Sequence, residues 1–238
     1  MSYDRILING DSYSAQEGCD GPVWADYITD KTGIPTINQA FMGSSNQRIT
    51  RSTLEYLDLL DGAENPLVII GWSFIRRIEI WHYGLGLEHR MPDRLSGDDV
   101  SKPRMCTLEW LLPPYEDLAT MEQKALLPDP KEVHKALTDF YTSVYMLAHT
   151  LEAKGIDYLF FSGANNTDIT LQAFPYVTGL SQVQWCDRNP KFYQMHDFCV
   201  QDWALANDPE CTAVTNHLST QGHEKFSAFL LDLFLEKG

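Results

Sequence analysis

The chain has 238 residues, of which 44% are hydrophobic and 21% are charged, a composition typical of a globular protein with a buried core. Its formal net charge of −15 argues against nucleic acid or an anionic membrane surface as a partner. No apolar stretch reaches the roughly 20 residues of a membrane-spanning helix. The N-terminus lacks a signal-peptide pattern, and the five cysteines form no CxxC pair. We therefore expect a cytoplasmic protein with no metal or other cofactor, and the oligomeric state stays open.

Short apolar runs alternate with amphipathic stretches along the chain, which predicts an α/β fold. The predicted strands are residues 5–9, 36–40, 66–70 and 157–161. The helices between them are expected to end at Gly33, Gly62 and Gly155, and a last helix is expected to begin at Ser219. This pattern predicts one domain over residues 1–238, a three-layer α/β/α sandwich with a mostly parallel, doubly wound sheet.

Between residues 81 and 128 the apolar periodicity fades, and no clear helix or strand pattern is found. A stretch of this length inside a compact domain is seldom a bare loop. We expect it to be an insertion after the third strand that packs near the functional site. Its aromatic side chains could line an acyl or sugar pocket, or could simply pack the insertion against the domain.

Each predicted strand is followed by a short segment of small and polar residues. The first is Gly10-Asp11-Ser12, and the others read MGSSN, GWS and SGANN. Because the carboxyl ends of parallel strands meet at one edge of a sheet, we expect these segments to share a site. Taken alone, Ser12 is either a nucleophile on a strand-to-helix turn or a cap of the next helix.

In their order and spacing these segments resemble the blocks of the SGNH (GDSL-type) hydrolase family. Gly10-Asp11-Ser12 matches the first block, and residues 38–45 (NQAFMGSS) match the second, with its glycine at Gly43. The third block, Gly-x-Asn, is matched in part by residues 71–73 (GWS), and the last by His217, just ahead of the final helix. The resemblance runs from residue 10 to residue 223 and leaves out the insertion.

The resemblance implies a flavodoxin-like SGNH hydrolase fold and ester hydrolysis through a serine nucleophile. It assigns Ser12 as the nucleophile and His217 as the general base that takes its proton and later protonates the leaving alkoxide. The implied oxyanion hole consists of the backbone N–H groups of Ser12 and Gly43, with Ser73 at the position of the family's asparagine. The expected substrate is an ester of a small molecule, a lipid or a glycan.

The third block departs from the family pattern, because Ser73 offers one hydroxyl where the family has an amide. Loss of one oxyanion donor typically lowers turnover by about a hundred- to a thousandfold. Three outcomes are open: Ser73 reorients to serve, or Asn46, Asn165 or Asn166 takes its place, or the activity is weak.

The last block also departs from the pattern. The family usually has an aspartate three residues before the histidine, and Val214 stands there. A Ser–His dyad is therefore expected, with the imidazole oriented by a backbone carbonyl or by a distant carboxylate, for which Asp202 and Asp208 are the candidates. His223, one turn into the last helix, is interpreted as structural.

Two arginines, Arg76 and Arg77, closely follow the third strand. A guanidinium here could bind a carboxylate or phosphate of the substrate, with Arg76 as the candidate, or it could belong to a structural ion pair under the insertion. Asp11, Asn46 and Asn165 are the other candidates for contacting the substrate or supporting the site.

These observations favour a serine esterase or acyl hydrolase that works through an acyl-serine intermediate. One alternative is a non-catalytic binding or structural protein that keeps the fold, since both the oxyanion asparagine and the triad acid are absent. Another is an acyltransferase, in which the same serine passes its acyl group to an alcohol in place of water.

Overall fold

The structure of the chain is a computed structural model that describes residues 3–15, 20–75, 77–82, 91–92, 104–109, 130–166, 177–194, 197–211 and 217–235. Its centre is a parallel sheet of four strands in the order β2-β1-β3-β7. These strands are β1 (Arg5–Gly10), β2 (Thr36–Asn38), β3 (Pro66–Trp72) and β7 (Asp157–Ser162). Their parallel pairing confirms the predicted α/β class with a mostly parallel sheet, and it places Gly10 beside Gly71 at the carboxyl edge.

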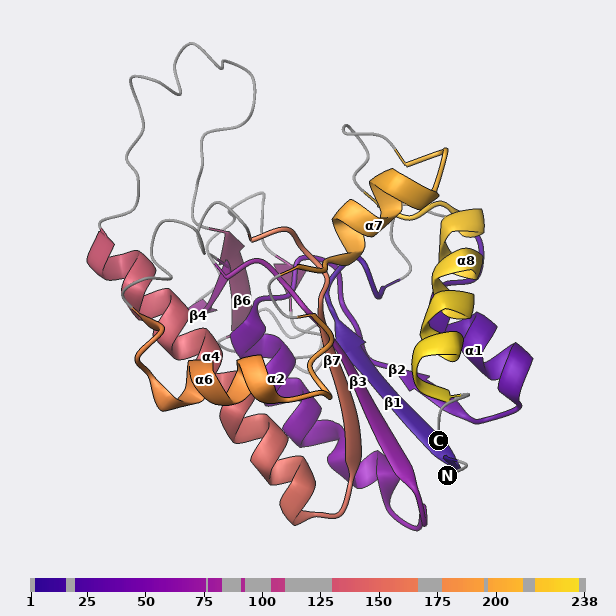
Figure 1. The fold of residues 1–238 in the computed structure, drawn as a ribbon, viewed down its shortest axis with the longest axis horizontal. Coiled ribbons are helices and arrows are strands. Elements are labelled where there is room, and N and C mark those ends of the chain that lie inside the picture. Colours follow the sequence, from indigo (N-terminus) through magenta and orange to yellow (C-terminus); the bar gives the residue numbers. More distant parts are fainter. Residues whose placement is uncertain are drawn as a thin grey trace.

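Alternate residues of each strand point into two separate cores, because side chains alternate across a sheet. Leu7, Val68 and Phe160 pack against one set of helices, and Ile8, Ile69 and Phe161 pack on the opposite face. Figure 1 shows the two layers of helices. On one side lie α2 (Asn46–Tyr56), α4 (Pro130–Ala153) and α6 (Ser181–Arg188), and on the other lie α1 (Trp24–Thr32) and α8 (Thr220–Leu230).

The outer edge of β7 carries two isolated parallel bridges, from Phe160 to Phe192 and from Ser162 to Cys199. Cys199 is followed directly by α7 (Val200–Asn207), which lies above the carboxyl ends of the strands (Figure 1). Both α6 and α7 fall in a stretch where the sequence predicts no element. Each has only two buried side chains, too few to make a clear periodic pattern.

The insertion contains strands that its sequence pattern did not predict. β4 (Arg77–His82), β5 (Met91–Pro92) and β6 (Arg104–Glu109) form an antiparallel sheet in the order β4-β6-β5. β4 begins at Arg77, five residues after the end of β3 and before the predicted start of the insertion. The small sheet lies beside α2 (Figure 1).

The predicted helix ends agree with the structure. Gly33 and Gly155 have φ values of 70° and 71°, in the left-handed region that glycine adopts without strain, and each stands just after a helix. α2 continues into the 3₁₀ helix η1 (Leu57–Leu60) before Gly62, and α8 continues into the π-helical turn η3 (Leu231–Leu235). Within the described ranges, no helix combines the length and the apolar character needed to cross a membrane.

Candidate active site

Ser12 and His217 are brought together at the carboxyl edge of the sheet. Ser12 Oγ lies 2.8 Å from His217 Nε2, although 205 positions separate the two residues in the chain. Ser12 follows the end of β1 by two residues, and His217 precedes Ser219, the N-cap of α8. With Nε2 unprotonated, the serine hydroxyl donates to the ring nitrogen, which is the geometry that general-base activation of a serine requires.

Residues 10–15 form a tight turn that presents Ser12, and we call it the nucleophile turn. The N–H groups of Ser14 and Ala15 both donate to the Asp11 carbonyl, at 3.0 and 2.9 Å. Ser14 is fully buried beneath the turn. A Cβ atom on Gly10 would lie 2.7 Å from Ser14 Oγ, and one on Gly71 would lie 2.8 Å from it. Both glycines are therefore required by close packing.

Gly43 lies in a segment held against the nucleophile turn. The N–H of Phe41 donates to the Gly10 carbonyl at 3.1 Å, and the Asn38 amide donates to the Ser14 carbonyl at 2.8 Å. Gly43 itself has a φ of 72°, a conformation that a residue with a side chain adopts only with strain. Ser45 then caps α2 by accepting from the Arg48 N–H.

Ser73 is completely buried, and its polar groups are bonded within the protein. Its N–H donates to Asn46 Oδ1 at 2.8 Å, and its carbonyl accepts from Asn46 Nδ2 at 3.1 Å. Its Oγ accepts from Arg77 Nη1 at 2.9 Å. The Asn166 amide bonds the same segment, through the Ile75 N–H at 2.9 Å and the Ser73 carbonyl at 3.4 Å. Asn46 and Asn166 thus fix the backbone after β3.

Asp11 is completely buried beside Ser12. Its Oδ1 accepts from the Tyr13 N–H, and its Oδ2 accepts from Arg77 Nη1, both at 3.2 Å. Burial raises the pKa of the Asp11 carboxyl, and the Arg77 guanidinium is the strongest of the groups that oppose this rise. The arginine that reaches the site is therefore Arg77, and Arg76 lies outside the described residues.

The Tyr13 ring stacks on the imidazole of His217, with ring centroids 5.1 Å apart and planes inclined by 17°. Tyr13 is itself buried, and the same residue donates its N–H to Asp11. The stacking restricts the plane of the His217 ring. This contact could not be predicted, because nothing in the pattern around Tyr13 shows that a ring from position 217 packs on it.

Asn165 is bonded to two residues of α7. Its amide Nδ2 donates to both carboxylate oxygens of Asp202, at 3.0 and 2.9 Å, and its N–H donates to Gln201 Oε1. These contacts tie the end of β7 to α7. Asp202, one of the two candidate distant acids, is thus paired with an exposed amide.

Asp208, the other candidate acid, holds Ser219, the N-cap residue of α8. Its Oδ2 accepts from the Ser219 N–H at 2.7 Å, and its Oδ1 accepts from the Ser219 hydroxyl at 2.9 Å. A Cβ on Gly222 would lie 2.1 Å from Asp208 Oδ2, so a glycine is required there. Asp208 thus supports the start of the helix that follows His217. Val214, with the rest of residues 212–216, lies outside the described residues.

His223 belongs to the packing between the two helices on its side of the sheet. Its Nδ1 accepts from the Trp24 N–H at 3.3 Å, and its side chain is 1% exposed. Burial lowers the pKa of His223 to about 4, so the imidazole is neutral at pH 7. It joins α8 to the start of α1, which agrees with the structural interpretation.

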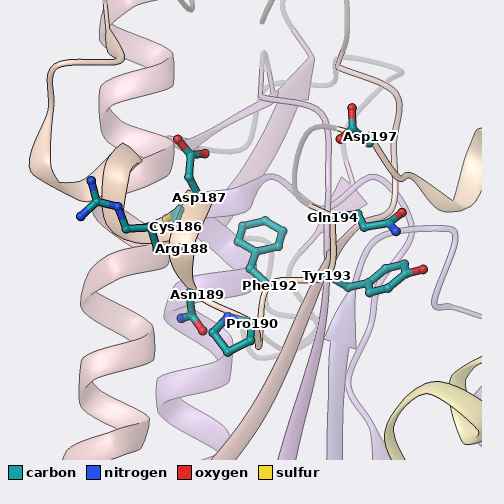
Figure 2. A pocket seen from close by; sticks show the side chains of 9 residues that line it. All are labelled: Cys186, Asp187, Arg188, Asn189, Pro190, Phe192, Tyr193, Gln194 and Asp197. Atoms are coloured by element: carbon teal, nitrogen blue, oxygen red, sulfur yellow. The ribbon is translucent and has the colours of Figure 1, made fainter.

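A separate cavity of about 340 Å³ lies along the segment from α6 to Asp197. Figure 2 shows the Phe192 ring in its middle, with Asp187 and Asp197 to either side. All nine lining residues come from positions 186–197, so neither Ser12 nor His217 contributes to it. Among the described residues, no three His, Cys, Asp or Glu side chains are grouped to hold a metal ion.

Solved structures of other proteins align with nearly the whole chain, at low sequence identity. The esterase EstA from Pseudoalteromonas sp. aligns over 98% of this chain and 98% of its own, with a TM-score of 0.54 and 12% identity. A lipase from a goat rumen metagenome aligns over 97% of both chains, with a TM-score of 0.51 and 14% identity. At such identities the likeness establishes a shared fold, and it confirms the three-layer fold that the resemblance implied. No family model and no curated protein sequence matches the chain.

Proposed function

We propose that the protein is a serine esterase, a hydrolase of carboxylic esters with Ser12 as its nucleophile and His217 as its general base. The observation that carries the proposal is the 2.8 Å contact between Ser12 Oγ and His217 Nε2 at the carboxyl edge of a parallel sheet. The same fold is used by an esterase and a lipase, and EstA is described as inhibited by monoethylphosphonate, a compound of the kind that modifies nucleophilic serines.

In the proposed reaction, Ser12 Oγ attacks the ester carbonyl while its proton passes to His217 Nε2. The tetrahedral intermediate then expels the alkoxide, which takes that proton and leaves as the alcohol. Water attacks the acyl-serine, gives its proton to Nε2 and releases the carboxylic acid as Ser12 recovers its hydrogen. The Tyr13 ring holds the imidazole in one plane through both steps.

The proposed oxyanion donors are the backbone N–H groups of Ser12 and Gly43, with the Ser73 hydroxyl as a third. Gly43 supports this assignment because its segment is bonded to the Gly10 and Ser14 carbonyls of the nucleophile turn. Ser73 is a weaker donor than an asparagine, because its Oγ accepts from Arg77 and its single hydroxyl hydrogen is bonded to the Asp11 carboxyl. We therefore expect an esterase of modest turnover, acting on esters of a small molecule, lipid or glycan.

The proposal is tested by hydrolysis of p-nitrophenyl acetate and p-nitrophenyl octanoate by the wild type, Ser12→Ala and His217→Ala. Turnover is expected in the wild type and is expected to fall by about 10³-fold or more in each variant. Ser181→Ala, which removes a hydroxyl from an exposed position at the start of α6, serves as the control and should keep full activity. A wild type no faster than Ser12→Ala on both esters would show that the chain is not an esterase of this kind.

The same assay separates hydrolase from acyltransferase. With glycerol or methanol added, a hydrolase releases acid as its main product, whereas a transferase forms the new ester in proportion to the alcohol. A wild type that neither hydrolyses nor transfers would favour the alternative of a non-catalytic protein that keeps the fold.

A further inference from the structure

Arg77 connects the small sheet to the nucleophile turn. It is the first residue of β4, and its Nη1 lies 3.2 Å from Asp11 Oδ2 and 2.9 Å from Ser73 Oγ. The guanidinium carbon is also 4.8 Å from the centroid of the Phe74 ring. The Arg77 side chain is only 12% exposed and that of Asp11 is not exposed at all. The positive charge of Arg77, at the start of the small sheet, therefore lies beside Asp11, the residue before Ser12.

The charge of Asp11 depends on this contact. A guanidinium remains protonated in proteins, so neutral Asp11 would leave a nearly buried cation uncompensated, and loss of Arg77 would leave a buried anion. Burial raises the pKa of Asp11. Arg77 from β4, the Ser73 hydroxyl after β3, the Tyr13 N–H and His217 all lower it, with Arg77 first among them. The two groups therefore form a unit in which each keeps the other charged.

The Asp11 carboxylate leads back to the catalytic pair through Tyr13. Its Oδ1 accepts the Tyr13 N–H at 3.2 Å, and the ring of the same tyrosine stacks on His217 at 5.1 Å. His217 Nε2 in turn lies 2.8 Å from Ser12 Oγ. A series of contacts thus runs from Arg77 through Asp11 and Tyr13 to the imidazole of His217. The imidazole in turn contacts Ser12, the residue that follows Asp11.

We propose that Arg77 is a positioning residue for the Ser12–His217 pair: it holds Asp11 as the carboxylate that fixes the Tyr13 backbone, and the Tyr13 ring in turn sets the plane of the imidazole. The proposal rests on the proposed esterase function and deepens it, because it makes the first strand of the insertion a part of the active site. Arg77 touches no reacting atom in this account and acts through its neighbours.

The test compares Arg77→Gln, Arg77→Lys, Asp11→Asn and the double variant Asp11→Asn/Arg77→Gln in ester hydrolysis over a range of pH. We expect Arg77→Gln to lower kcat by about 10- to 100-fold, the effect of a slightly misplaced catalytic group, with KM changed less than about twofold. The acid limb of its kcat/KM profile should move to higher pH, because Asp11 then takes up a proton more readily. Arg77→Lys should recover part of the loss.

Two comparisons make the test specific. The kcat of the double variant should be no lower than that of the less active single variant, because the two residues act as one unit. Arg51→Gln, which removes an equivalent guanidinium from an exposed ion pair with Glu55 on α2, should leave kcat and the pH profile unchanged. Should Arg77→Gln fail to fold, Arg77→Lys carries the same prediction for the acid limb.

The outcomes separate this proposal from the one on which it rests. A wild type that turns over no ester overturns both. If the wild type is active and the Arg77 variants keep its kcat, the role of Arg77 is overturned while the esterase proposal stands. The same holds if the variants lose kcat with an unchanged pH profile and additive effects in the double variant.

Discussion

The ends of β1 and β3 lie side by side and use their polar residues in opposite ways. Both ends carry a glycine that makes room for Ser14, and both are followed by a serine, Ser12 in one case and Ser73 in the other. Ser12 Oγ reaches a histidine from the far end of the chain, whereas Ser73 is bonded to Asn46 and Arg77. A buried hydroxyl that faces a base is placed for the proposed chemistry, while one surrounded by amides and a guanidinium mainly holds the backbone in place.

The difference between the two strand ends is tested most strongly by replacing each of the two serines with alanine. Ser12→Ala removes the proposed nucleophile, and we expect kcat for p-nitrophenyl acetate to fall by about 10³-fold or more. Ser73→Ala removes a hydroxyl that is already hydrogen-bonded within the protein. We therefore expect kcat to fall by only about tenfold, below the usual range for an oxyanion donor. Equal losses in the two variants would contradict the distinction between the strand ends.

The two glycines are predicted to differ in how they tolerate a side chain. In Gly71→Ala the only atom within 3.0 Å of the new Cβ is Ser14 Oγ, whereas in Gly10→Ala the backbone oxygen of Gly71 also lies at 2.9 Å. Each variant should lose about 1–3 kcal/mol of unfolding free energy by overpacking, and Gly10→Ala should lose more.

A second substitution at Ser14 sharpens this difference. Ser14→Ala should restore most of the stability of Gly71→Ala and little of that of Gly10→Ala, because the backbone clash of Gly10→Ala persists. Urea unfolding of the four variants measures the effect. Equal rescue of both would show that Ser14 alone decides the packing.

The two histidines near the C-terminal helix offer a second comparison. His217 contacts Ser12, whereas His223, within the helix, serves packing. Its folded pKa of about 4 lies below the unfolded value of 6.5, so its stabilising effect is complete above pH 6.5 and is lost as the pH falls toward 4. Between pH 7.5 and pH 5 we expect this group alone to reduce the free energy of unfolding by about 2 kcal/mol.

The variant His223→Asn isolates that contribution, because the amide oxygen can accept the Trp24 N–H and does not titrate in this range. The difference in stability between the wild type and His223→Asn should change by the same amount over the interval. An unchanged difference would mean that the buried imidazole is not the source of the pH dependence.

The two asparagines are expected to differ in their effect on stability, and Asn165 gives the smallest effect of all. Asn46→Ala leaves the N–H of buried Ser73 without the Asn46 acceptor and leaves its carbonyl with the longer 3.4 Å contact from Asn166, and it should cost about 1–3 kcal/mol. Asn165→Ala breaks the exposed contacts with Asp202 and should cost less than about 1 kcal/mol. Thermal unfolding compares them directly, and an Asn165 variant as damaging as the Asn46 variant would contradict the assignment.

The sequence allowed Ser12, Gly43 and His217 to be predicted because each stands at a strand end or ahead of a helix, where order along the chain determines position. Arg77 could not be singled out from the sequence, because β4 was not predicted and the contact of Arg77 with Asp11 joins residues 66 positions apart. The stacking of Tyr13 on His217 depends on a contact between distant parts of the chain, which local patterns do not encode.

The main sheet was predictable because three of its strands, β1, β3 and β7, are short apolar runs with nearly every residue buried, whereas the residues of β2 are only half-buried. The small sheet was not, because the pattern of residues 81–128 mixes prolines, aromatic residues and charges.

The reactive serine can be located directly by mass spectrometry of tryptic peptides after incubation with a fluorophosphonate probe. The account predicts a single adduct on Ser12, with Ser14 and Ser73 unmodified, and its formation should be slowed by about 10³-fold or more in His217→Ala. No adduct on Ser12, an adduct on another serine, or a labelling rate that His217→Ala leaves unchanged would contradict the claim that these two residues form the catalytic pair.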